Sequence, residues 1–399
     1  MIPSEPVGLE GVLGQVDRFL LPRGDGRALR FLVNHLFIPH NRREWIWSRV
    51  PLGLLGLAQW DSSAPFGPST VRATDLIGEV LDWARTEVSG ERDGDWSFIL
   101  HRDRPLLEWT RLLLFLFHAR EREPVAVVKL ARHGLRSEWE ALRYLSRALP
   151  PELAASVPFP AVYRAFDGAE AVLMRALPGR SMFHEIGSRP LGARKVEYHL
   201  SNGATWLACF HLVTRDSSAA FRAEEQAGRL KSDLPDWFEG AELDALSSTK
   251  LEIPLSASHG DFWARNLLFR KRPGRRLRRM TEISGVVDWE HFSPSAPPFE
   301  DLFHFALTYA FDYPWTPFTR KQPEDAFRRG FLSRNAVSRA IRSAFVGYCD
   351  LTGLPFEKLK PLFQVFLLGR SRRRDASRPV PWSSLHRLLA ESRATVFEI

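Results

Sequence analysis

Two short stretches decide the fold of this 399-residue chain: His259-Gly-Asp-Phe-Trp-Ala-Arg-Asn266 and Val286-Val-Asp-Trp-Glu290. The first runs into the apolar segment 267–269, and the second is apolar until it reaches its acidic residues. Both have the branched and aromatic residues typical of strands, so we expect a hairpin that brings Asp261, Asn266 and Asp288 together. Two carboxylates and one amide oxygen form an incomplete set of hard oxygen ligands. Such a set suits Mg²⁺, which also binds phosphate oxygens and water.

The sequence before these motifs reads mostly as strands. Branched and aromatic residues between polar turns predict antiparallel strands at 96–100, 111–117, 125–130, 161–166 and 171–176. Leucines at helical spacing predict one helix between Gly134 and Pro150. A shorter helix is expected over 74–84, with Leu76, Val80 and Leu81 facing inward.

After a Leu-Pro-Gly turn at 177–179 the pattern becomes mostly helical. One long helix is predicted to bury a face made of Val196, Leu200, Ala204, Leu207 and His211. The order of elements predicts an α+β protein in two lobes. We divide the chain into an N-terminal extension of unknown role (1–90), a sheet lobe (91–177) and a helical lobe (178–399).

Lys129 stands at the end of an apolar strand, where a charged group is costly unless an anion meets it. The alternative is a lysine at the end of a strand that reaches water. Glu138 and Glu140 in the following helix are the candidate partners. Glu138 shares the inward face of Leu142 and Leu145, whereas Glu140 lies roughly opposite, so we choose Glu138.

The pattern H-G-D-x-x-x-x-N, followed about twenty residues later by V-V-D-W-E, resembles the aminoglycoside phosphotransferase and choline kinase-like family. These proteins are distant relatives of protein kinases. The resemblance implies a protein-kinase-like fold, with a small antiparallel-sheet N-lobe carrying one helix and a mostly helical C-lobe. It also implies transfer of the γ-phosphoryl group of ATP or GTP to a hydroxyl group. Asp261 would be the catalytic base, Asn266 and Asp288 would hold Mg²⁺, and His259 would hold the loop.

The resemblance covers roughly 96–302 and implies nucleotide-binding residues in the sheet lobe. Lys129 would contact the α and β phosphates and pair with Glu138. The segment 172–179 resembles the family's hinge, which places the base against Met174, Arg175, Ala176 and Leu177. No glycine occurs between Asp95 and Ala131, so the turn over the phosphates is expected at 102–105.

Two further positions match motifs of the same family. The segment Pro298-Phe-Glu-Asp-Leu302 resembles P-x-x-D-L, which makes Asp301 a loop anchor rather than a catalyst. His211 ends a helix that resembles the one before the catalytic loop, and we expect it to be a packed structural histidine.

Positive charge is concentrated in the last quarter of the chain. From Leu302 onward there are 16 lysines and arginines against 8 aspartates and glutamates, while the whole chain carries +8. A basic wall beside the acceptor argues against a polycationic aminoglycoside and favours a neutral or anionic small molecule such as a sugar, nucleoside or related metabolite. The alternative is a solvated basic face. Nucleic acid is an unlikely partner, because the cluster at 370–374 lacks interleaved aromatic residues.

The remaining composition gives a location and leaves other functions open. There is no apolar run long enough to span a membrane and no secretory signal, and the two cysteines lack metal-type spacing, which predicts a cytoplasmic protein. A kinase-like pseudoenzyme that binds nucleotide or regulates a partner is the alternative function. A protein kinase is disfavoured because no activation loop or A-P-E segment follows Asp288.

Overall fold

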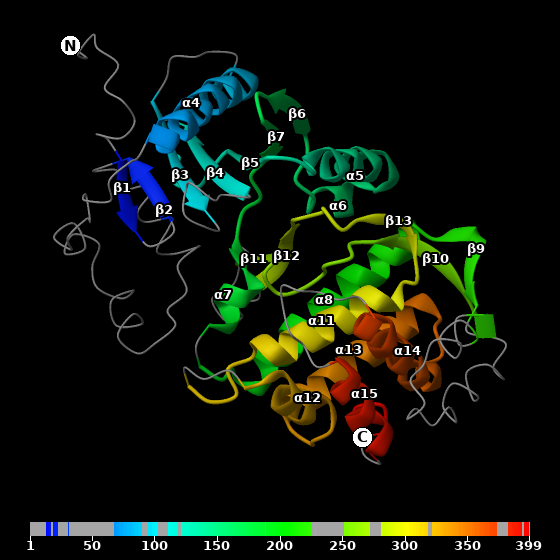
Figure 1. Ribbon diagram of the computed structural model, residues 1–399. Coiled ribbons are helices and arrows are strands. Elements are labelled where there is room, and N and C mark those ends of the chain that lie inside the picture. Colours follow the sequence, from blue (N-terminus) through cyan, green and yellow to red (C-terminus); the bar gives the residue numbers. More distant parts are fainter. Residues whose placement is uncertain are drawn as a thin grey trace, which may run out of the picture. The chain divides into compact units, whose positions relative to one another are not determined.

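The computed structural model describes residues 13–16, 19–22, 31, 68–89, 95–102, 111–118, 121–187, 189–222, 224–225, 228, 251–271, 281–317, 321–372, 382–392 and 395–398. The chain forms two compact units (Figure 1). The first comprises Met1–Arg147 and Ala154–Arg180, and the second comprises Ala148–Leu153 and Ser181–Ile399. In the described part of the chain no helix is both long and apolar enough to cross a membrane.

The first unit is built on a seven-stranded antiparallel sheet with the order β1-β2-β3-β4-β5-β7-β6. Its strands are β1 (Leu13–Val16), β2 (Phe19–Pro22), β3 (Trp96–Arg102), β4 (Arg111–His118), β5 (Ala126–Ala131), β6 (Ala161–Phe166) and β7 (Ala169–Arg175). The five strands expected from the apolar segments are therefore confirmed. The predicted turn at 102–105 lies almost entirely outside the described residues.

Helix α4 (Pro68–Ser89) covers one face of this sheet. Ile77, Val80 and Trp83 pack in one buried cluster with alternate residues of the strands, including Leu114 and Val128. Alternation along a strand sends neighbouring side chains to opposite faces, so Lys129 points away from α4. The helix extends the predicted segment 74–84 at both ends. Together with β1 and β2, it joins the sheet unit, although it comes from the stretch that we treated as an extension.

Helix α5 (Leu135–Ala148) lies where a single N-lobe helix was expected. It begins directly after Gly134, whose φ of +91° favours glycine. The carboxylate of Glu170 accepts a hydrogen bond from the backbone N–H of Leu135 at 2.8 Å, which satisfies one of the donors left free at a helix start. Leu135, Leu142 and Leu145 are buried, as the leucine spacing predicted.

The second unit is mostly helical. Its helices are α6 (Pro151–Ala154), α7 (Met182–Ile186), α8 (Ala193–Val213), α11 (Phe299–Asp312), α12 (Pro323–Phe331), α13 (Ala336–Thr352), η4 (Phe356–Lys358), α14 (Leu359–Arg372) and α15 (Trp382–Glu391). Two small sheets complete it, in the orders β13-β10-β9 and β12-β11-β8. Their strands are β8 (Arg180–Ser181), β9 (Asp216–Arg222), β10 (Glu252–Ser258), β11 (Leu267–Lys271), β12 (Thr281–Val286) and β13 (Ser293–Ala296). A sheet-based unit and a mostly helical unit confirm the expected α+β class.

The core of the second unit forms around α8, α11 and α13. Every residue of the predicted inward face of α8, from Val196 to His211, is buried. Aromatic rings fill the space between the helices, and Phe303 contacts both Phe345 and Phe363. The predicted hairpin is also present, since β11 pairs with β12 in antiparallel register from Leu267 opposite Val286. The basic segment between these strands lies largely outside the described residues.

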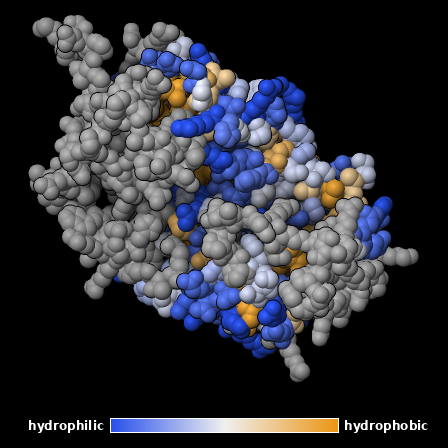
Figure 2. All heavy atoms as spheres, viewed as in Figure 1, coloured by the Kyte–Doolittle hydropathy of each residue, from blue (hydrophilic) through white to orange (hydrophobic). Residues whose placement is uncertain are grey.

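Few large apolar side chains of the described residues are exposed. Those that are exposed are Val88, Tyr144, Leu212, Val213 and Leu351. On the face seen in Figure 2, hydrophobic residues accordingly appear only as small separate patches. Isolated apolar residues of this kind are normal on a protein surface.

Alanine substitutions at two glycines of the helical unit should change the free energy of unfolding in opposite directions. A Cβ at Gly203 in α8 would overlap the ring of Phe305, whereas a Cβ at Gly347 in α13 would have no neighbour within 4 Å. We expect Gly203→Ala to lower the free energy of unfolding by about 1–3 kcal/mol through overpacking. Gly347→Ala should raise it by up to about 1 kcal/mol through helix propensity. Urea unfolding of both variants measures these effects, and a stabilised Gly203→Ala protein would contradict the described packing.

Burial of His199 should make the folded protein less stable at acid pH. Burial, with a smaller effect from the positive charge of Lys195, lowers the pKa of His199 from 6.5 to about 3. Below about pH 6.5 His199 therefore binds a proton in the unfolded chain but stays neutral in the folded chain. The free energy of unfolding thus falls as the pH falls. This one group should cost about 2 kcal/mol between neutral pH and about pH 5.

His199→Asn tests the pH effect, because an amide does not titrate and can still meet the Tyr309 hydroxyl, which lies 3.3 Å from His199 Nδ1. We expect the variant to lose about 2 kcal/mol less than the wild type over this pH range in urea unfolding. An equal loss in both proteins would show that His199 is not the group responsible. His386, whose pKa is lowered by burial to about 4, should leave a residual acid loss in both proteins.

Candidate active site

The loop at 259–266 follows directly from β10 and turns sharply at Gly260. Gly260 has a φ of +78°, and a Cβ there would overlap the backbone carbonyl oxygen of His291. Both the backbone conformation and the close approach therefore require glycine. This turn places Asp261 beyond the end of the strand.

Asp301 in the first turn of α11 anchors the backbone of this loop. Its carboxylate accepts hydrogen bonds from Ser258 Oγ at 3.0 Å, from the His259 N–H at 2.7 Å and from the Gly260 N–H at 2.9 Å. Burial opposes its ionisation, but the neighbouring His211 and these donors hold the pKa of Asp301 at about 2. A carboxylate with several backbone donors is stabilised in its charged form. The predicted role of Asp301 as a loop anchor is confirmed.

The two predicted structural histidines are both buried, and each holds a neighbouring element. His259 Nε2 lies 3.0 Å from the carbonyl oxygen of Val287, and its ring packs against Trp289 at 4.4 Å between centroids. His259 therefore connects the loop to the residues after β12. His211 Nδ1 lies 2.8 Å from the Tyr348 hydroxyl, which joins α8 to α13.

Asp261 is held in place by two side chains. Its Oδ1 lies 3.0 Å from His304 Nε2, and its Oδ2 accepts a hydrogen bond from Asn266 Nδ2 at 3.3 Å. Burial would raise the pKa of Asp261, but the hydrogen bond and positive potential of His304 outweigh it and lower the pKa below its usual value. The group is therefore a carboxylate at neutral pH.

Asn266 and Asp288 flank the paired ends of β11 and β12. The N–H of Val287 donates to the carbonyl oxygen of Asn266 at 2.9 Å, so the two candidate ligands come from adjoining backbone. Because Asn266 Nδ2 donates to Asp261, its ligand atom for a cation would be Oδ1. Asp288 has a φ of +70°, a conformation found in no other described non-glycine residue. Backbone strain of this kind is often kept at functional sites.

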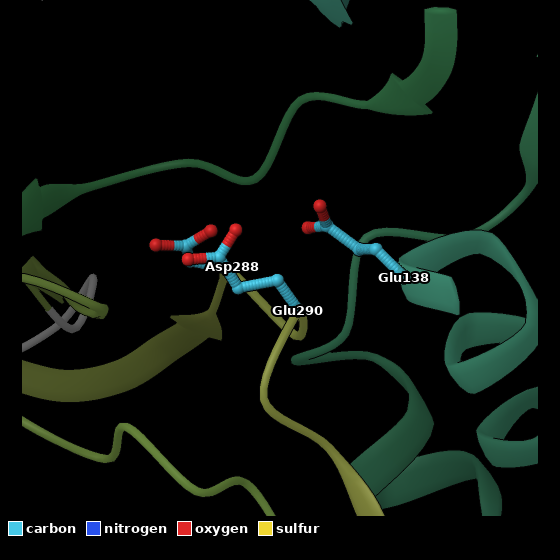
Figure 3. A group of neighbouring side chains, drawn as sticks. All are labelled: Glu138, Asp288 and Glu290. Carbon is cyan, nitrogen blue, oxygen red and sulfur yellow. The ribbon is translucent and has the colours of Figure 1, made fainter. Parts of the chain in front are cut away.

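Glu290 adds an acid that the sequence analysis did not assign. Oxygen atoms of Asp288 and Glu290 lie within 4.8 Å of each other on the turn that follows β12 (Figure 3). The signal for Glu290 was its place two residues after Asp288. Two carboxylates and the amide oxygen of Asn266 are donors that Mg²⁺ accepts, so these residues fit the expected metal.

In the sheet unit, Lys129 pairs with Glu138. Glu138 lies in the first turn of α5 (Figure 3). The distance from Lys129 Nζ to Glu138 Oε2 is 2.6 Å, and both side chains are buried. Glu140 is exposed and pairs with Arg136 at 3.1 Å. These contacts confirm that Glu138, and not Glu140, is the partner of Lys129. The role of Lys129 and Glu138 in nucleotide binding stays a prediction.

The predicted hinge residues lie at the end of β7 and just after it. Met174 is buried and stands opposite Val127 in the sheet. The Arg175 guanidinium donates to the carbonyl oxygens of Ala155 at 3.2 Å and Val157 at 3.4 Å. The N–H of Ala176 donates to the carbonyl oxygen of Val125 at 3.2 Å, which fixes the backbone before Leu177. Contact of these four residues with a nucleotide base stays a prediction.

The comparison with protein families identifies the chain. The model of the "Phosphotransferase enzyme family" matches residues 114–342, which is more than half of the sequence. The chain belongs to this family of kinase-type phosphotransferases, and its sheet unit and helical unit match the protein-kinase-like fold inferred from the motifs. No curated protein sequence matches the chain.

Among solved structures, two similar proteins are a macrolide phosphotransferase and an aminoglycoside phosphotransferase. The apoenzyme of macrolide 2'-phosphotransferase MphH from Brachybacterium faecium is 15% identical, with 78% of this chain and 98% of that chain covered and a TM-score of 0.43. Aminoglycoside phosphotransferase APH(3'')-Id from Streptomyces rimosus is 13% identical, with 74% and 97% covered and a TM-score of 0.41.

His304 was missed from the sequence, although its position carried a signal. It stands three residues after Asp301 on α11, and residues at that spacing share one helix face. Burial, with a smaller effect from the positive charge of Arg370, lowers the pKa of His304, whereas the hydrogen bond with Asp261 favours its charged form. A neutral imidazole can still donate from Nε2 to the Asp261 carboxylate.

We expect His304→Phe to lower the kcat for phosphoryl transfer by about tenfold to a hundredfold, because a hydrogen bond to a charged group contributes about 1.5–3 kcal/mol. The KM for nucleotide should change little. His304→Gln supplies a neutral N–H donor and should recover most of the rate. Steady-state formation of ADP or GDP in the presence of an accepted hydroxyl compound measures both constants, and equal loss in both variants would contradict a positioning role.

Proposed function

We propose that this protein transfers the γ-phosphoryl group of ATP or GTP to a hydroxyl group of a small molecule. The observation that supports this most directly is the ionised carboxylate of Asp261. It is fixed by His304 and Asn266 on a loop whose backbone is tied to Asp301. A rigid carboxylate at such a position can accept a hydrogen bond from an acceptor hydroxyl and align it for in-line attack.

The depressed pKa of Asp261 determines how it would act. A weak base does not remove a proton from an alcohol early in the reaction. In the loose transition state of phosphoryl transfer the attacking oxygen becomes acidic only as its bond to phosphorus forms. Asp261 therefore orients the hydroxyl first and receives its proton late.

Asn266 Oδ1 and Asp288 would hold the metal, and Glu290 is available as a further ligand. When bound, Mg²⁺ would neutralise phosphate charge. Lys129, held by Glu138, would place its ammonium group against the α and β phosphates. Met174, Arg175, Ala176 and Leu177 would lie beside the base.

The acceptor is proposed to be neutral or anionic, such as a sugar, nucleoside or related metabolite, rather than an aminoglycoside. Arg370 on α14 belongs to the basic last quarter of the chain, and its charge contributes to the lowered pKa of His304. The positive charge of Arg370 therefore acts on the residue that touches Asp261, where the carboxylates of Asp261 and Asp301 act in the opposite direction. Positive charge on this side of the site repels a polycation and attracts an anion.

Asp261→Asn tests this function. The amide keeps the size of the side chain but cannot receive a proton, so we expect kcat to fall by about 10²–10⁴-fold. The measurement is phosphate transfer from labelled ATP or GTP to a panel of sugars and nucleosides. Asp350→Asn is the matched control, because Asp350 is an exposed aspartate on α13.

The same variants separate catalysis from binding. Asp261→Asn should keep the rise in Tm that ATP or GTP with Mg²⁺ produces in the wild type, since it leaves the proposed nucleotide contacts intact. Wild-type turnover in Asp261→Asn would refute the assigned role. Nucleotide binding without transfer to any acceptor would favour the alternative of a kinase-like regulatory protein.

A further inference from the structure

A small cavity, partly open to solvent, lies in the helical unit, between the end of α8, β10 and the turn after α13. Its volume is about 150 Å³, and its walls include Ile253, Leu354 and Pro355. A cavity of this size in another protein binds benzene, so the space here is large enough for one ring. None of the residues assigned above to catalysis or nucleotide binding lines it.

A hydroxyl group in the wall of the cavity is buried and forms no hydrogen bond within the described part of the chain. Ser256 is 1% exposed, and its Oγ has no partner there. It lies on the same face of β10 as Ser258, whose hydroxyl donates to Asp301. An unsatisfied buried hydroxyl is costly, so a bound molecule with a polar group would relieve this cost.

Arg215 and Glu252 bring one charge of each sign to the wall of the cavity. The Arg215 guanidinium donates to the carbonyl oxygen of Thr352 at 2.9 Å, and no carboxylate of the described residues pairs with it. Glu252 also lines the cavity, but its carboxylate pairs with Arg222 at 2.9 Å. Arg222 also pairs with Glu225 at 3.1 Å. Within the described residues Arg215 is thus the lining cation that forms no ion pair, and it lies beside apolar walls. A small organic anion with an apolar body matches these features.

The wall of this cavity connects to the catalytic loop. Tyr348 and His211 both line the cavity and lie 2.8 Å apart from hydroxyl to Nδ1. His211 Nε2 lies 3.6 Å from Asp301 Oδ2, so the two side chains are in contact although the distance is too long for a good hydrogen bond. Asp301 holds the backbone N–H groups of His259 and Gly260. A ligand that restrains Tyr348 and His211 would restrain this anchor.

We propose that this cavity is an effector site for a small organic anion, and that its occupancy stabilises the loop carrying Asp261. The polar contacts would come from Ser256 and Arg215. Binding of the anion does not depend on the proposed function. Only an effect of the anion on turnover would rest on the proposed function.

Benzoate is a suitable probe, with benzamide as its uncharged counterpart. Saturation-transfer NMR and thermal shift should detect benzoate binding to the wild-type protein, with benzamide binding at least about tenfold more weakly. Arg215→Gln should weaken benzoate binding by about tenfold or more. Arg339→Gln, at an exposed arginine on α13, should leave benzoate binding unchanged. Ser256→Leu should abolish binding by filling the cavity. Because Arg215 is exposed, Arg215→Gln tests the site even if Ser256→Leu does not fold.

Hydrogen exchange tests the connection to the loop without requiring any activity. Saturating benzoate should slow exchange of the His259 and Gly260 amides by about fivefold in the wild type and not in Arg215→Gln. If the wild type does not bind benzoate, or if Arg215→Gln binds it equally well, the proposal of a binding site in this cavity would be overturned. Binding that leaves loop exchange unchanged would overturn the effector role. Failure of phosphoryl transfer alone would affect neither measurement.

Discussion

The structure of the candidate site depends on one buried carboxylate, that of Asp301. Its two oxygens bind the Ser258 hydroxyl and two successive backbone N–H groups, and they determine where the chain goes after β10. A short loop after a strand has backbone donors that no sheet can satisfy, and these donors need partners when buried. Asp301 supplies those partners from α11. The position of Asp261 is therefore determined by a carboxylate that belongs to a different element of the chain.

Aromatic packing extends this constraint to the residues after β12. The rings of His259 and Trp289 are in contact, and Trp206 stacks on both Phe210 and Phe262. Rigid aromatic groups bury large areas and permit few alternative arrangements. The loop and the turn that carries Asp288 and Glu290 thus belong to one packed cluster. Positions of the candidate ligands are set by this cluster as much as by the hairpin.

The sequence predicted well those features that depend on local pattern. The strands, the hairpin and the buried face of α8 follow from apolar periodicity, and Glu138 differs from Glu140 because the two lie on opposite sides of a helix. His304 did not follow in this way. It stands 43 residues after Asp261, and only the packing of α11 on the loop brings them together. Ser256 and Arg215 were missed for the same reason, since a cavity arises between segments.

The long helix α4 determines which piece of this chain can exist alone. The family match begins at residue 114, so a shortened chain designed from it would lack both α4 and β3. The apolar face made by Leu114, Leu116 and Val128 would then meet water, and β4 would become an unprotected edge strand. Exposed sheet edges and broad apolar faces promote aggregation. The catalytic region defined by sequence similarity is thus smaller than the region that folding requires.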